Sequence, residues 1–345
     1  MPESNPYKLQ PKTAYWKPAV GGVHFSEIVE LSKPIPLSAT DKIATAGSCF
    51  AQHIGRALRD RGATYLDLEP APAYLSPGEA TEHGFNIYSC RYGNIYTVRQ
   101  LLTIAREATE GFVPSDRIWK INDRYCDAMR PSVDPVGHAS AETVIALREH
   151  HLKKVRELFT TLDIFVFTLG LTEGWVSTAD GTTYPLCPGT AAGEYDSKKY
   201  AFKNFSYPEI LSDLEEFWRI LKLLNPKARI ILTVSPVTLA ATASDLHVLV
   251  ANTYSKSTLR AVAGDFCSRH DDAFYFPSFE IITTHVNRGS FFNPDQRTVN
   301  EFGVKHVMDH FFKTVSLPDV QGKKEEEEDE AVVCDEGKLE KYAMV

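Results

Sequence analysis

Residues 42–62 read KIATAGSCFAQHIGRALRDRG and decide the fold of this chain. The first five residues predict a short strand, after which Gly47 and Ser48 turn the chain. The stretch 49–61 repeats apolar residues at a period of 3.6 and predicts a helix, with its apolar face at Phe50, Ile54, Ala57 and Leu58. Gly62 is a typical helix end. A strand that passes through a tight turn into a helix is typical of a parallel α/β sheet.

The same alternation of strand and helix continues toward the C-terminus. Nearly continuous apolar runs predict buried strands at 162–168 and 229–234, and shorter strands are predicted at 64–68 and 273–276. Amphipathic stretches predict helices within 92–107 and over 141–160, 207–224, 245–266 and 300–313. Long segments at 110–137 and 174–203 predict irregular insertions. We therefore expect a mostly parallel sheet with helices on both faces, whose ligands bind beyond the carboxyl ends of the strands.

Length and charge divide the chain of 345 residues into three parts. The polar, proline-rich residues 1–40 predict an arm, and residues 41–317 predict a single α/β domain. The run KKEEEEDE at 323–330 predicts a solvated, disordered acidic tail over 318–345, with an acidic interaction segment as the alternative. The net charge of −8 argues against a nucleic-acid partner, because phosphate binding needs a basic surface.

The start of the chain and its cysteines indicate a soluble protein of the cytoplasm. No apolar signal segment opens the sequence, and no apolar run approaches the length of a membrane span. The six cysteines are scattered without a Cys-x-x-Cys pair, which disfavours zinc and a dithiol motif, so we expect reduced thiols. No metal and no cofactor is predicted.

Cys49 is the first candidate for chemistry, because it follows the turn and opens the predicted helix. Free N–H groups and the positive end of the helix dipole would lower its pKa and would also donate to an oxyanion. The alternative is a small buried hydrophobic residue, which is what a lone cysteine usually is. The Gly-Ser setting favours the functional interpretation.

Three further places carry candidate site residues. Gly93 and Asn94 form an uncharged donor pair suited to an oxyanion, or an ordinary turn before a helix. Glu173, after a buried strand, would orient a base or bind substrate hydroxyls, or would merely cap the backbone. His247 begins a predicted helix, where a neutral imidazole base is favoured, although a lone histidine is usually not catalytic. His306 and His310 are spaced i, i+4 but lack a third metal ligand, so we expect edge or surface positions.

The motif GSCFA at 47–51 matches the signature of the GSCFA family, which this chain therefore resembles. Further matches in the same order are TLG at 168–170, SPV at 235–237, YSKS at 254–257 and FEI at 279–281, so the resemblance spans 43–312. The family is considered related to the SGNH/GDSL hydrolases. That relationship implies a three-layer, flavodoxin-like sheet and acyl-ester chemistry.

The SGNH blocks can be carried over residue by residue. Gly-Asp-Ser-Leu corresponds to 47–50, which implies that Cys49 holds the nucleophile position and Ser48 the neighbouring one. The glycine of the second block corresponds to Gly93. Gly-x-Asn-Asp corresponds to Gly170-Leu171-Thr172-Glu173, where Thr172 replaces the oxyanion asparagine and Asn94 is the candidate substitute.

The last block departs from the pattern. Asp-x-x-His corresponds to Asp295-Gln296-Arg297-Thr298, so Thr298 stands where the catalytic histidine is expected. A cysteine nucleophile needs a base or a lowered pKa, and the base must then come from elsewhere. His247 is the first candidate, with His53 and His285 as weaker ones.

The resemblance implies an acyltransferase or acyl-ester hydrolase that works through a thioester on Cys49. The acceptor would be a saccharide or another hydroxylated small molecule, and acyl-CoA is a possible donor substrate. The alternative, suggested by Thr298, is an inactive ligand-binding or partner-binding protein on a decayed fold. A redox-sensing thiol is a third interpretation, which requires a distant cysteine to approach Cys49 in the fold.

Overall fold

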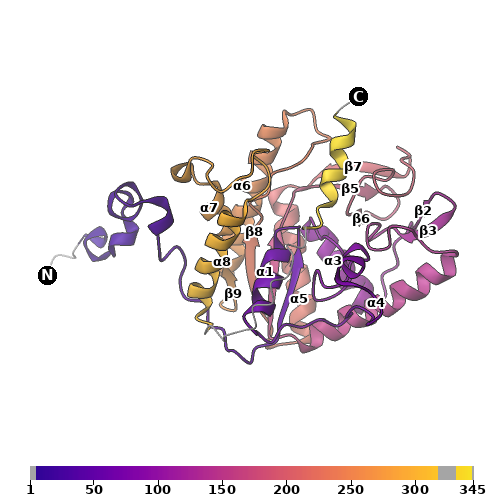
Figure 1. The fold of residues 1–345 in the computed structure, drawn as a ribbon, viewed down its shortest axis with the longest axis horizontal. Helices are drawn as coiled ribbons and strands as arrows, with labels where there is room; N and C mark the ends of the chain where they lie inside the picture. Colours follow the sequence, from indigo (N-terminus) through magenta and orange to yellow (C-terminus); the bar gives the residue numbers. More distant parts are fainter. Residues whose placement is uncertain (1–4, 318–331, 344–345) are drawn as a thin grey trace.

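The computed structural model describes residues 5–317 and 332–343 and is built around a parallel sheet (Figure 1). The sheet has the order β1-β4-β8-β9, and its strands are β1 (Ile43–Gly47), β4 (Ile164–Leu169), β8 (Arg229–Val234) and β9 (Ala273–Tyr275). β1, β4 and most of β8 are buried on both sides, which explains their nearly continuous apolar sequence.

The strand predicted at 64–68 is reduced to a single parallel bridge between Tyr65 and Ile43. The Ile43 N–H donates to the Thr64 carbonyl oxygen at 2.9 Å, and the Leu66 N–H donates to the Ile43 carbonyl oxygen at 2.8 Å. This bridge lies on the side of β1 that does not pair with β4. If the segment at 64–68 is counted as the second strand of the chain, the strands lie across the sheet in the order 2-1-3-4-5. That is the flavodoxin-like order, and the predicted fold class is confirmed.

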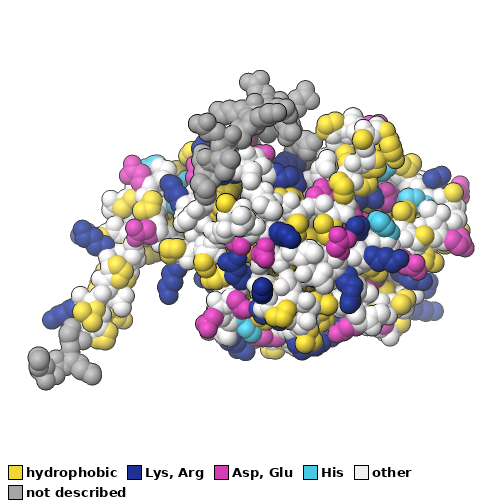
Figure 2. Space-filling model, turned by 90° about the horizontal axis from the view of Figure 1, so that it is seen from below, with side chains coloured by type: hydrophobic (Ala, Val, Ile, Leu, Met, Phe, Trp, Pro, Cys, Tyr) yellow, Lys and Arg dark blue, Asp and Glu magenta, His cyan; other side chains and the backbone are white. Residues whose placement is uncertain are grey.

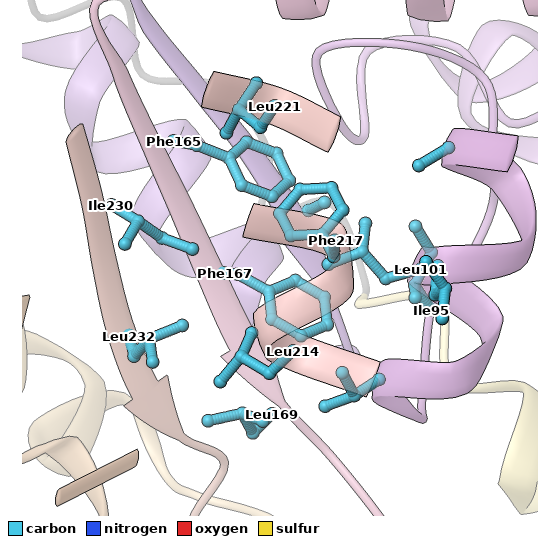
Figure 3. Packing of buried hydrophobic residues seen from close by; sticks show 14 of the residues in the cluster. Ile95, Leu101, Phe165, Phe167, Leu169, Leu214, Phe217, Leu221, Ile230 and Leu232 are labelled. Carbon is cyan, nitrogen blue, oxygen red and sulfur yellow. The ribbon is translucent and has the colours of Figure 1, made fainter. Parts of the chain in front are cut away.

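Helices cover both faces of the sheet. The α-helices of the described residues are α1 (Ala51–Asp60), α2 (Pro77–Glu82), α3 (Val98–Glu110), α4 (Ala141–Thr161), α5 (Tyr207–Leu224), α6 (Val248–Arg269), α7 (Ser278–Thr283) and α8 (Glu301–Val315). Phe165 and Phe167 of β4 point toward α3 and α5, where they meet Leu101, Leu214 and Phe217 (Figure 3). The intervening Ile164 and Val166 pack with α1, α7 and α8 on the other face. This alternation makes the three layers.

The two segments predicted as irregular insertions contain small antiparallel sheets, so that prediction is partly wrong. One is the hairpin β2 (Ile118–Ile121) and β3 (Arg124–Asp127); the other has the order β6-β5-β7, from β5 (Glu173–Ser177), β6 (Thr183–Tyr184) and β7 (Tyr200–Asn204). The rings of Trp119, Tyr184 and Tyr200 pack where the two meet. Strands this short depend on such tertiary contacts, which local sequence patterns do not reveal.

The N-terminal arm projects from the body of the molecule (Figures 1 and 2). It forms four single-turn segments, which are η1 (Pro6–Leu9), η2 (Lys12–Ala14), η3 (Lys17–Gly21) and η4 (Phe25–Glu27). The arm meets the domain where Phe25 packs edge-on against Phe291, with ring centroids 5.4 Å apart. Farther along, the Ile35 N–H donates to the Thr314 carbonyl oxygen at 2.9 Å.

Residues 332–343 pack on the domain, so the prediction of a disordered tail is wrong for this part of 318–345. They contain the short helix η6 (Asp335–Tyr342), which lies beside β5 and β7 in Figure 1. Asp335 and Glu336, predicted to be solvated, are buried because polar partners meet them in the fold. The acidic run at 323–330 lies outside the described residues.

No helix in the ranges 5–317 and 332–343 combines the length and the apolarity needed to cross a membrane. Among the same residues, no group of three or more His, Cys, Asp or Glu side chains is placed to hold a metal ion.

Candidate active site around Cys49

Cys49 lies at the carboxyl end of β1, in the predicted turn, and its side chain is buried. Gly47 makes the turn possible: its φ is +138°, and a Cβ there would lie 2.5 Å from the Thr168 carbonyl oxygen. Helix α1 starts at Ala51, two residues later than predicted. Within the described residues, the N–H groups of Cys49 and Phe50 have no hydrogen-bond acceptor, as is usual where a helix begins.

Ser48, in the position beside the candidate nucleophile, is held by the sheet. Its N–H donates to the Thr168 carbonyl oxygen at 3.3 Å, so the sheet already uses it. Its hydroxyl is buried and has no partner among the described residues. Gly170 packs closely behind it, since a Cβ on Gly170 would lie 3.0 Å from the Ser48 Cβ.

Asn94 does lie at the site, and its side-chain amide has a fixed orientation. Its Oδ1 accepts from the Tyr88 hydroxyl at 2.7 Å, which leaves Nδ2 as the donor toward the site. Nδ2 donates to the Val333 carbonyl oxygen at 3.2 Å and to the Asp335 carboxylate at 2.7 Å. The preceding Gly93 has a φ of +68°, so the predicted turn is present.

Gln52 is a site residue that the sequence analysis missed. It lies on the first turn of α1 and is fully buried. Its Nε2 donates to the Val333 carbonyl oxygen at 2.8 Å, and its Oε1 accepts from the Val333 N–H at 3.0 Å. The side-chain amides of Gln52 and Asn94 therefore both donate to the Val333 carbonyl oxygen. Two donors that point at one oxygen are the arrangement of an oxyanion hole. The only local signal was a glutamine on the inward face of an amphipathic helix.

The loop that carries Gly93 and Asn94 is anchored by a buried pair behind it. The Glu69 carboxylate accepts from the Arg91 N–H at 2.7 Å and from His151 Nδ1 at 2.6 Å. Burial raises the pKa of Glu69, but the hydrogen bond and the charge interaction with His151 outweigh it and lower this pKa to about 2. For His151, burial lowers the pKa to about 4. Glu69 is thus ionised at neutral pH, and His151 is neutral.

We expect this pair to make the protein sensitive to acid. His151 stabilises the fold above pH 6.5 and loses that contribution as the pH falls toward 4, and Glu69 loses its own between about 4.5 and 2. Urea unfolding between pH 7.5 and 4.5 should show a decrease on the order of 2 kcal/mol. His151→Gln can still donate to Glu69 but does not titrate, so it should flatten this decrease. Equal pH dependence in both proteins would contradict the assignment.

Residues 332–336 lie directly over Cys49. The Cys49 thiol is hydrogen-bonded to Cys334, and both line a cleft of about 700 Å³. Other residues lining this cleft are His53, Val237, Asn293, Thr298 and Met308. The chain's own C-terminal segment therefore occupies the site.

Charged side chains surround the two thiols. Arg297 Nη2 lies 3.7 Å from the Cys334 sulfur and 3.5 Å from the Glu336 carboxylate. Lys256 is buried, and its Nζ donates to the Gly170 carbonyl oxygen at 2.8 Å. Burial lowers the pKa of Lys256 to about 8 and raises that of Glu336 to about 7. Neither Arg297 nor Lys256 was a predicted site residue, although Lys256 falls in the YSKS motif and Arg297 in the last SGNH block.

The expectation of a lowered Cys49 pKa is wrong for this arrangement. The hydrogen bond to Cys334 and burial both raise the pKa of Cys49 well above its ordinary value. The same hydrogen bond, helped by Arg297 and opposed by burial, lowers the pKa of Cys334 to about 6. The thiolate of the pair is therefore on Cys334, and Cys49 holds the proton.

The C-terminal block reaches the same cleft. Thr298 lines it beside Cys49, and its hydroxyl donates to the Asp295 carboxylate at 2.6 Å. Asn293 Nδ2 donates to the Thr298 hydroxyl at 3.0 Å. Thr298 thus shares the cleft with Cys49, and its side chain is a hydroxyl and not an imidazole.

Two predicted residues lie away from Cys49. His247 is exposed at the start of α6, where its Nδ1 accepts from the Leu249 N–H at 3.2 Å. Lys256 lies on the same helix nine residues farther on, so His247 is about 13 Å along the helix axis from it. Glu173 accepts from the Thr242 hydroxyl at 2.8 Å and lines a second cavity; burial raises its pKa.

The remaining candidates differ in their relation to the cleft. Thr172 is buried, and its N–H donates to the Ser255 hydroxyl at 3.0 Å. His285 stacks on Trp16 of the arm, with ring centroids 5.8 Å apart. His53 shares the cleft with Cys49, so among the three proposed bases it is the one that the fold brings to the nucleophile position.

The second cavity has a volume of about 470 Å³ and lies between β5, β7 and η6. Its wall contains the rings of Trp175, Tyr195 and Phe202, with Trp175 packing edge-on against the other two. Glu173 and Glu336 line the same cavity. Since Glu336 also contacts Arg297, it lies between the second cavity and the thiol pair.

One of three comparisons with known proteins agrees with the matched motifs. No curated protein was found as a sequence relative. Among solved structures, a carbohydrate esterase family 3 protein from Talaromyces cellulolyticus is similar at 11% identity and a TM-score of 0.36, covering 79% of this chain and 94% of that one. The sequence model of the GSCFA family matches residues 42–311. That match spans most of the chain, so this protein belongs to the GSCFA family.

Proposed function

We propose that this protein is an acyltransferase or acyl-ester hydrolase in which Cys49 is the nucleophile. The observation that carries the proposal is the Val333 carbonyl oxygen, which Gln52 and Asn94 hold with two amide donors. Val333 directly precedes Cys334, which shares a cleft with Cys49. A substrate acyl group placed there would have its oxygen in a preorganised donor pair. Residues 332–336 must move away before substrate can enter, since they occupy this position.

The proposed reaction has two steps. The Cys49 sulfur bonds to the acyl carbon, the oxygen takes up negative charge facing Gln52 and Asn94, and collapse releases the leaving group and leaves a thioester. A hydroxyl group of the acceptor then attacks the thioester and frees the thiol. His53 is the proposed proton acceptor, because it shares the cleft and follows Cys49 by one helical turn. Transfer is favoured over hydrolysis, because a thioester reacts readily with nucleophiles better than water.

The second cavity supports a hydroxylated acceptor such as a saccharide. Its aromatic rings provide flat apolar faces, and the Glu173 carboxylate provides an acceptor for hydroxyl groups. A thioester such as acyl-CoA would suit as donor, because exchange with a cysteine conserves the thioester bond.

The second candidate function is that of a binding protein without catalysis. Thr298 stands in place of the expected base, and the chain's own segment fills the site. In that case Cys49 would not acquire an acyl group. The two functions are separated by mass spectrometry of the intact protein after exposure to an activated ester or an acyl-CoA.

We expect wild-type protein to gain one acyl group on Cys49, and Asn94→Asp to gain it about 10²-fold more slowly. Aspartate retains the oxygen that accepts from Tyr88 but lacks the Nδ2–H donor, so the variant removes the oxyanion contact with little change in shape. The rate of adduct formation checks this, with thermal unfolding as the control for stability. An unchanged rate would argue against the oxyanion role.

A further inference from the structure

The docking of residues 332–336 holds Cys334 in one place. The Val333 main chain pairs with Gln52 in both directions, at 3.0 and 2.8 Å. On the other side of Cys334, Asp335 accepts from Asn94 at 2.7 Å. Both neighbours of Cys334 are thus fixed by buried amides, and its side chain is turned toward Cys49.

This contact joins two thiols that are far apart in sequence. Cys334 is half-buried and packs against the same hydrophobic cluster as the buried Cys49. Both thiols line the same cleft, and each shifts the pKa of the other, so the two side chains lie beside each other. The Arg297 guanidinium lies 3.7 Å from Cys334 and stabilises negative charge on its sulfur.

We propose that Cys49 and Cys334 form a disulfide when a peroxide oxidises Cys334, and that this bond locks residues 332–342 over the nucleophile. The formation of the bond stands on the geometry alone. Its consequence, reversible inactivation, rests on the proposed function. Cys334 then supplies the distant partner that a redox-sensing Cys49 requires.

The chemistry balances in two steps. The Cys334 thiolate attacks a peroxide oxygen, and the S–O bond forms as the O–O bond breaks, giving a sulfenic acid. The leaving hydroxide or alkoxide takes a proton from solvent and departs as water or an alcohol. Cys49 sulfur then attacks the Cys334 sulfur, the S–S bond forms, and the S–O bond breaks with loss of water that carries the Cys49 proton. Two thiols are oxidised by two electrons, and the peroxide takes up both.

The proton distribution in the pair suits this order of events. The thiolate is the species that reacts with peroxide, and the lowered pKa of Cys334 places it on the more accessible sulfur. The raised pKa of Cys49 keeps that residue protonated until the sulfenic acid has formed beside it.

The experiment is disulfide mapping of the full chain. Protein treated with one equivalent of hydrogen peroxide is alkylated, digested and examined by mass spectrometry. We expect a cross-linked peptide pair containing Cys49 and Cys334, a loss of two hydrogen atoms per molecule, and reversal by dithiothreitol. Cross-linking of either residue to another cysteine, or irreversible oxidation of Cys49 while Cys334 stays reduced, would overturn the proposal.

Three variants make the test specific. Cys334→Ser should abolish the cross-link, whereas Cys267→Ser, which alters a half-buried thiol on α6, should leave it unchanged. Val333→Pro removes the N–H that donates to Gln52 and should reduce the cross-link several-fold, because Cys334 is no longer held in place. An undiminished cross-link in Val333→Pro would contradict the role of docking.

The mapping also separates this proposal from the proposed function. A cross-link in a protein that never accepts an acyl group would support the disulfide and reject the enzyme. An acyl adduct on Cys49 without a cross-link would do the reverse.

Discussion

Replacing Cys49 with serine is expected to lower the rate of acyl transfer by at least about 10³-fold. The serine hydroxyl has a far higher pKa than a thiol, and Thr298 cannot act as the base that a serine nucleophile would need. The intact mass should show no acyl group on the variant under conditions that label the wild type. Steady-state transfer from the same donor measures the loss.

Cys267→Ser is the matched control for this substitution, because it makes the same change at a thiol outside the cleft. Its transfer rate should equal that of the wild type. If Cys49→Ser and Cys267→Ser are equally active, Cys49 is a structural residue and the proposed function fails.

Replacing Gly47 with alanine is expected to destabilise the fold by about 3 kcal/mol or more. At a φ of +138° a side chain is strained, and its Cβ would lie 2.5 Å from the Thr168 carbonyl oxygen and 2.8 Å from the Thr168 nitrogen. β1 and β4 would have to separate, although their pairing continues to Gly47 and Thr168. The free energy of unfolding from denaturant titration gives the size of the effect.

Gly78→Ala serves as the control. Gly78 is exposed in α2, its φ is not in the left-handed region, and a Cβ there meets nothing within 4 Å. Its replacement should stabilise the protein by up to about 1 kcal/mol, because alanine favours the helix. Equal stabilities of the two variants would show that the turn at Gly47 tolerates a side chain.

Some of the site could be predicted and some could not. Cys49, Asn94 and Thr298 were candidates from motifs. Cys49 and Thr298 line one cleft, and Asn94 donates to the carbonyl oxygen of Val333, the residue before Cys334, which lines that cleft too. Gln52 lies in no matched motif, and the motif that contains Lys256 does not indicate a role for it. The contacts that a polar side chain on a helix makes depend on the tertiary structure. His247 lies at the start of α6, as predicted, but it is exposed and does not line the cleft that contains Cys49.

By itself, the sequence determined the strand, the Gly47 turn, the first helix and the parallel sheet. These features depend on local backbone geometry and on the periodic spacing of apolar residues, both of which are set by residues close together in the sequence. Only the tertiary structure decided that Val333 pairs with Gln52 and that Cys334 meets Cys49. Both are contacts across more than 280 residues, and they reverse the expected charge of Cys49, because a thiol's pKa depends on the groups that surround it in space.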